Sequence, residues 1–193
     1  MSEETLNTNL QKKIIFFIQK KLKNLIILLT LIIITLFSFL VYKNLENKNN
    51  IKLSEKYSQA VILLNQNKME ESKLLLQYII SKKNKFYSPL ALYLIIDQSL
   101  ENDSKKIIIF FDKILKIKSI DKENLNLIKI KKSIFLFKLG KEELIIKTLN
   151  PIINSNSVWR NMAIKLLSDY FLFNNQKVKA EEYIQLLNNE KNK

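Results

Sequence analysis

Apolar positions along this chain follow two different patterns. From Leu25 to Tyr42 the run LIILLTLIIITLFSFLVY carries no charge and has no polar face. From residue 51 onward, apolar residues recur at intervals of three and four, which is typical of amphipathic helices, and no Val/Thr-rich alternating runs occur. The sequence therefore predicts an all-α protein with one very apolar helix near its N-terminus.

The second pattern resolves into helices that are separated by short polar breaks such as NQNK, ENDS and NSNS. Because breaks this short force neighbouring helices to lie antiparallel, we expect four helical hairpins. The expected helices cover residues 51–66, 69–83, 87–101, 103–117, 122–139, 141–154, 156–173 and 176–189.

One motif occurs twice along these helices. YSPLALYLIID begins at Tyr87 and WRNMAIKLLSD begins at Trp159, and both place an aromatic residue, Ala, Leu and Asp at the same spacing. Such a repeat is typical of an α-solenoid, in which one packing unit is used several times. A chance similarity between two apolar helices is the alternative.

At a finer scale the hairpins resemble tetratricopeptide repeats, with a polar turn, an acidic helix start and then a small residue. The turn KLGKEELII contains the single glycine, Gly140, which is free to take positive φ. Helices that cross closely need small side chains at the crossing, and aromatic residues head the repeated motif. The expected packing residues are Ala60, Ser72, Ala91, Ala163, Ala180, Tyr87 and Trp159.

The apolar run is about 27 Å long as a helix, which is enough to cross a membrane. A buried core helix and a cleaved signal peptide are the alternatives, but no A-x-A-like site follows the run. Lysines precede it, so the positive-inside rule favours a cytoplasmic N-terminus. We expect a basic cytoplasmic tail (1–23), a transmembrane helix (24–42), a polar linker (43–50) and a helical-repeat domain outside the cytoplasm (51–193).

Composition excludes most catalytic and cofactor chemistry. The chain has no Cys, no His and one Gly, which excludes disulfides, thiolate or His catalysis, typical zinc or haem sites and a Gly-rich phosphate loop. The Glu–Glu pairs stand at expected helix starts, where negative charge is favourable. We therefore expect no catalytic residue, no metal, no cofactor and no enzyme activity.

The net charge of +14 raises nucleic acid or an anionic membrane as a partner. The chain has only one Arg, however, and its richness in Lys, Asn and Ile is typical of A/T-biased codons, so no nucleic-acid partner is expected. One cluster without acidic neighbours forms either a solvated face or a surface for anionic lipid or an acidic partner. It contains Lys129, Lys131, Lys132, Lys138 and Lys141.

A second candidate surface is aromatic. Stacked helical repeats bind partners in a concave groove, and Trp, Tyr and Arg are the residue types that dominate interfaces. The candidate partner-binding residues are Tyr93, Arg160 and Tyr170.

The apolar run, the two motif copies and the closing KAEEYIQLL together resemble the bacterial ancillary SecYEG translocon subunit family. This chain departs from the family in having almost no Gly or Ala in its turns and helices. The resemblance implies a single-pass inner-membrane protein with a tetratricopeptide-like periplasmic domain. It also implies translocon subunits and periplasmic chaperones as partners, in the transfer of emerging proteins; the sequence sets no oligomeric state.

Two other functions remain open at this point. One is an envelope scaffold that links the membrane to division or cell-wall machinery. The other is a basic nucleic-acid or lipid binder that faces the cytoplasm, which the topology of the chain would separate from the first two.

Overall fold

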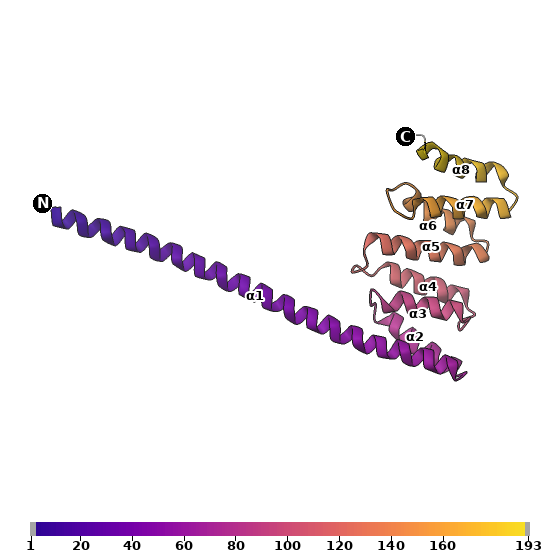
Figure 1. The fold of residues 1–193 in the computed structure, drawn as a ribbon, viewed down its shortest axis with the longest axis horizontal. Helices are drawn as coiled ribbons and strands as arrows, with labels where there is room; N and C mark the ends of the chain where they lie inside the picture. Colours follow the sequence, from indigo (N-terminus) through magenta and orange to yellow (C-terminus); the bar gives the residue numbers. More distant parts are fainter. Residues whose placement is uncertain (1–2, 192–193) are drawn as a thin grey trace. The chain divides into compact units, whose positions relative to one another are not determined.

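The computed structural model describes residues 3–191, with side chains described for residues 12–187 except 19 and 25. These residues form eight helices and no strand, so the all-α prediction is confirmed for the described part of the chain (Figure 1). The helices are α1 (Glu3–Asn65), α2 (Met69–Ser81), α3 (Tyr87–Asp97), α4 (Ser104–Leu115), α5 (Lys122–Lys138), α6 (Glu142–Ile153), α7 (Arg160–Phe173) and α8 (Lys177–Lys191).

The chain divides into two units, Met1–Lys52 and Leu53–Lys193, and the division falls within α1. The first unit contains a helical stretch that is long and apolar enough to cross a membrane, and none of that stretch is buried. Within it, the hydroxyls of Thr30 and Thr35 donate to the carbonyl oxygens of Ile27 and Ile32, each at 2.8 Å. These bonds satisfy the polar side chains without a partner outside the helix.

Residues 43–50, which the sequence assigns to a polar linker, are helical and continue α1. The segment reads KNLENKNN and contains neither Gly nor Pro. Its polar residues are compatible with a helix, so nothing in it breaks the hydrogen-bond ladder.

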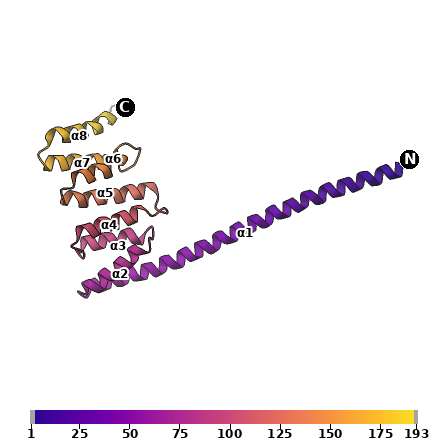
Figure 2. The same cartoon turned by 180° about the vertical axis from the view of Figure 1, so that it is seen from behind.

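In the second unit the helices pack in the order in which they follow one another along the chain. Figure 1 and Figure 2 show α2 to α8 stacked in this order from either side. Neighbouring helices contact each other from α2 to α8, and α5 also contacts α7. The helix expected at 51–66 is the C-terminal part of α1 rather than a separate helix. From α2 onward the expected boundaries differ by at most four residues, at the end of α3 and at the start of α7, which begins at Arg160 because a turn at Ser157 precedes it.

The same turn closes four helix ends in the second unit. At each turn one residue has positive φ, between 50° and 62°. The N–H of the next residue donates to the carbonyl oxygen five positions back, at 2.8 to 3.2 Å, which is the long bond of a Schellman motif. The sequence predicted only the glycine among these residues, which are Asn67, Ser99, Gly140 and Asn175.

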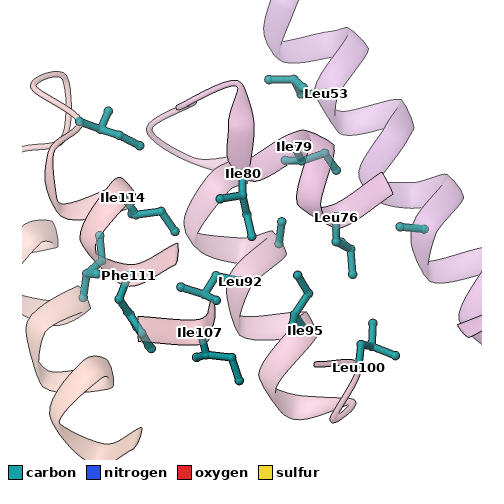
Figure 3. Packing of buried hydrophobic residues seen from close by; sticks show 14 of the residues in the cluster. Leu53, Leu76, Ile79, Ile80, Leu92, Ile95, Leu100, Ile107, Phe111 and Ile114 are labelled. Atoms are coloured by element: carbon teal, nitrogen blue, oxygen red, sulfur yellow. The ribbon is translucent and has the colours of Figure 1, made fainter. Parts of the chain in front are cut away.

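Two clusters of buried side chains form the core of the second unit. The first extends from Leu53 to Ile128, and Figure 3 shows part of it, where Leu76, Leu92 and Phe111 come from three successive helices. The second extends from Ile130 to Ala180. Each cluster therefore joins helices that follow one another along the chain, the first in the N-terminal half of the second unit and the second in its C-terminal half.

Small residues lie where helices cross. All four alanines and Ser72 are at most 1% exposed. The Ser72 hydroxyl donates to the carbonyl oxygen of Ala60 at 2.9 Å, and the Ser168 hydroxyl donates to that of Ala180 at 3.1 Å. Each pair is separated by twelve residues, with the positions of Ser and Ala exchanged. A short serine side chain reaches the backbone of a neighbouring helix only where the two helices approach closely.

Candidate functional site

Helices α3 and α5 carry two matching stripes of side chains. In each stripe the residues are spaced by four, three and four positions, which places them on one face of a helix. The first stripe mixes apolar residues with one acid, and the second alternates apolar residues with lysines. They are Phe86, Leu90, Tyr93 and Asp97 on or next to α3, and Leu127, Lys131, Ile134 and Lys138 on α5.

These stripes line two adjoining hollows. The first has a volume of about 350 Å³ and lies between the N-terminal parts of the two helices, with Leu90 and Leu127 among its walls. The second has a volume of about 140 Å³ and lies between their C-terminal parts, with Ile134 among its walls. Tyr93 lines both hollows. Because the N-terminal parts of α3 and α5 lie together, as do their C-terminal parts, the two helices run parallel. We call the two hollows together the Tyr93 groove.

The walls of the Tyr93 groove combine apolar area with one aromatic hydroxyl. Phe86, Leu90 and Ile134 remain 56%, 44% and 38% exposed, although they are large apolar residues. Tyr93 is half-buried, and this burial raises the pKa of its hydroxyl to about 12. Like an ordinary tyrosine hydroxyl, it is protonated at neutral pH and able to donate a hydrogen bond.

The expected basic cluster is divided between the groove, other surfaces and the interior. Lys131 and Lys138 line the second hollow, and the Lys131 Nζ lies 5.2 Å from the centre of the Tyr93 ring, a cation–π distance. Lys129 is half-buried and its Nζ lies 3.4 Å from the side-chain oxygen of Asn126. Lys141 is exposed at the N-terminus of α6.

The prediction that Lys132 belongs to an exposed basic surface is wrong. Lys132 is only 9% exposed, and its Nζ lies 2.7 Å from the Asp112 carboxylate on α4. The cluster lacks an acidic residue along the sequence, but the packing of α4 against α5 supplies one. Lys131 and Lys132 point to different surfaces because successive helix residues are rotated by about 100°.

The three expected partner-binding residues do not lie together. Tyr93 lines the groove, whereas Tyr170 is only 3% exposed and meets the Phe137 ring edge-on at 5.1 Å between centres. Tyr170 therefore does not present its ring to a partner, and that expectation is wrong. Arg160 is half-buried, and its Nε donates to the carbonyl oxygen of Ile153 at 2.8 Å, which ties α7 to α6.

The repeated motif serves packing in both copies. Tyr87 and Trp159, the aromatic residues that head it, are half-buried against the two core clusters. The next residue in each copy donates a hydrogen bond to the end of the preceding helix. The Ser88 hydroxyl donates to the carbonyl oxygen of Ile79 at 2.9 Å, and the Arg160 Nε donates to the carbonyl oxygen of Ile153 at 2.8 Å. One copy therefore attaches α3 to α2, and the other attaches α7 to α6.

Carboxylates in the described structure connect helices. Glu142 accepts hydrogen bonds from Gln176 and Lys179, which joins α6 to α8 and lowers the Glu142 pKa. Glu101 is 8% exposed and lies 3.3 Å from the Lys73 Nζ. The pKa of Glu101 is lowered, mainly because its carboxylate accepts a hydrogen bond from the backbone N–H of Asp103, and to a smaller extent because Lys73 and Lys106 lie nearby. Among the described residues no group of acids suits a metal ion.

The Tyr93 groove offers apolar contact, one hydroxyl donor and two ammonium groups, which is chemistry suited to binding. Sequence reasoning found Phe86, Tyr93, Lys131 and Lys138 but missed the aliphatic residues of the groove, Leu90, Leu127 and Ile134. Their signal was the spacing that α3 and α5 share, which becomes visible once the two helices are known to be neighbours.

A scan against protein-family models gives no match for this chain, and comparisons with curated proteins and with solved structures give no match either.

Proposed function

We propose that this chain is a membrane-anchored protein-binding module whose repeated helical hairpins present the Tyr93 groove to a partner protein. The observation that carries the proposal is the groove itself, in which large apolar side chains stay exposed beside a tyrosine and two lysines. Apolar and aromatic side chains that are surrounded by polar groups are typical of protein interfaces.

A tetratricopeptide-like solenoid of four hairpins is the architecture that we propose for the second unit. It is supported by the four equivalent turns and by the small residues at helix crossings. In such a stack the first helices of successive hairpins lie next to each other and form a continuous binding face. Helices α3 and α5 have this relationship, which explains why one groove is built from two parallel helices.

For the anchor, we propose that residues 24–42 cross the membrane once, with the N-terminus in the cytoplasm and the second unit in the periplasm. The apolar stretch is not buried in the chain, which disfavours a core helix of a soluble protein. An alkaline phosphatase fused to the C-terminus should be active. An inactive fusion, with a stable fusion protein in the membrane, would favour a binder that faces the cytoplasm.

The translocon is the partner that we propose, because the chain resembles ancillary SecYEG subunits in its apolar run and repeated motif. The module would stand beside the translocon and assist the transfer of emerging proteins to periplasmic chaperones. An envelope scaffold for division or cell-wall machinery is the alternative function.

Photocrosslinking in intact cells tests the groove and the partner together. A benzoylphenylalanine replaces Leu90, which is 44% exposed in the groove, and a matched variant carries it at Ile109, which is 49% exposed on α4. We expect the Leu90 variant to crosslink translocon subunits or periplasmic chaperones, identified by mass spectrometry, and the Ile109 variant not to do so. Division or cell-wall proteins at Leu90 would support the scaffold, and equal products at both positions would refute the groove.

A further inference from the structure

We propose that the Tyr93 groove selects extended acidic–apolar segments, with a large apolar side chain in the first hollow and a carboxylate about three residues away at the second. This inference rests on the proposed protein-binding function and specifies the chemistry of the bound segment. It follows from the different character of the two hollows.

The first hollow provides the apolar end. Its volume of about 350 Å³ lies at the lower end of the roughly 300–1,000 Å³ of typical ligand pockets. Leu90, Leu127 and the Tyr93 ring form its walls, and one charge of each sign, Lys85 and Asp121, also lines it. With its charges balanced, this end selects for apolar area, such as one aromatic or long aliphatic side chain.

The second hollow provides the charged end. Lys131 and Lys138 line it and Asp97 is the one acid among its lining residues, so positive charge prevails there. Within the described structure neither lysine pairs with a carboxylate, although Lys132 beside them does. The apolar walls of Ile96 and Ile134 reduce the exposure to water around a carboxylate bound here, which strengthens its attraction to the lysines.

The spacing of the two ends follows from helix geometry. Leu90 lies seven residues before Asp97 on α3, which corresponds to about 10 Å along the helix axis. An extended chain advances about 3.3 Å per residue, so this distance corresponds to three residues. A flat anionic lipid surface does not match this arrangement, because the two lysines stand within a groove and next to apolar walls.

Binding of designed peptides to the full chain in nanodiscs of neutral lipid tests the inference. The probes are immobilised twelve-residue Gly/Ser peptides that contain one tryptophan and one glutamate three positions apart, in either order. Matched probes replace the glutamate by lysine, replace the tryptophan by serine, or place the two residues six positions apart. Binding is measured by biolayer interferometry at low and at moderate salt.

We expect one order of tryptophan and glutamate to bind about threefold to tenfold more tightly than its lysine counterpart, as fits two partly exposed charge pairs. The Lys131→Glu/Lys138→Glu variant should reverse this preference, so that the lysine peptide binds better. The control Lys147→Glu/Lys165→Glu, which changes two exposed lysines on α6 and α7, should keep the wild-type preference.

A preference that the groove variant does not change would overturn the inference. So would peptide binding that depends on tryptophan alone, or acid-independent binding of all probes. If no peptide binds while phosphatidylglycerol vesicles bind through Lys131 and Lys138, the lysines serve a lipid surface instead. In each of these cases a translocon or chaperone crosslink at Leu90 would still support the proposed function, whereas the absence of both peptide binding and crosslinks would remove both proposals.

Discussion

Two buried serines provide a sharp test of the helix crossings. Ser133 on α5 and Ser168 on α7 stand at the same distance before the turn residues Gly140 and Asn175, and both are 0% exposed. The Ser168 hydroxyl donates to the carbonyl oxygen of Ala180 at 3.1 Å. The Ser133 hydroxyl has no hydrogen-bond partner among the described residues. Replacing each serine by alanine should therefore change stability in opposite directions.

The expected magnitudes follow from these environments. Ser168→Ala removes a hydrogen bond that contributes about 1 kcal/mol. Ser133→Ala removes a buried hydroxyl whose unpaired state costs about 1–2 kcal/mol. Both variants also gain roughly 0.5 kcal/mol of helix propensity, which cancels in their difference. We expect Ser168→Ala to destabilise by about 0.5 kcal/mol and Ser133→Ala to stabilise by about 1.5–2.5 kcal/mol.

Thermal unfolding of the full chain in detergent micelles measures this difference, with fluorescence of the single tryptophan, Trp159, as the probe. Trp159 packs against the second core cluster, which α5 and α7 help to form, so its signal reports the relevant region. At about 2–4 °C per kcal/mol for a domain of this size, the two variants should differ in Tm by about 4–12 °C. Equal shifts in the same direction would refute the reasoning, since a shared effect of alanine would then outweigh the difference in hydrogen bonding.

Two further predictions concern a turn and a buried carboxylate. Gly140→Ala should destabilise the protein by about 1–2 kcal/mol in the same assay, because φ is 62° there; nothing within 4 Å would clash with the new methyl group, so the cost comes from the backbone. Asn175→Gly, at a turn residue with φ of 59°, should be neutral or stabilising, and an equal loss of stability in both variants would contradict this explanation. The lowered pKa of Glu101 means that its stabilising contribution is present above its ordinary value of 4.5 and is lost as the pH falls through the lowered pKa. The Tm of Glu101→Gln should therefore lie below wild type at neutral pH, and the gap should close as the pH falls below 4.5; a gap that stays constant on acidification would show that Glu101 does not contribute to the acid sensitivity.

The helices were predictable because their signal is local. Apolar residues at intervals of three and four mark the buried face of each helix, and short polar breaks mark the turns. The polarity of residues 43–50 predicts a linker, yet polarity alone does not end a helix when Gly and Pro are absent, and these residues are helical. Among the described residues five have positive φ, and the sequence indicated only Gly140, since Asn, Ser and Lys also occur in ordinary loops.

The groove was predictable only in part. Tyr93 and Lys131 were found by residue type, and the structure brings them within 5.2 Å of each other, measured from the Nζ to the ring centre. Residue type also selected Lys132 and Tyr170, which the structure buries. Whether a lysine or a tyrosine faces water or the interior depends on which helix packs against its own, and a single helix does not carry that information.

Local sequence signals were enough to place most helices of the second unit, to identify the stretch that is apolar enough to cross a membrane, and to mark the small residues that recur in this unit. Each of these properties depends on residues close together in the chain. Helix packing, in contrast, makes α3 and α5 parallel neighbours, places Asp112 against Lys132, and leaves Leu90 and Ile134 exposed in one groove. These features join residues from different helices, and it is the packing of whole helices that brings them together.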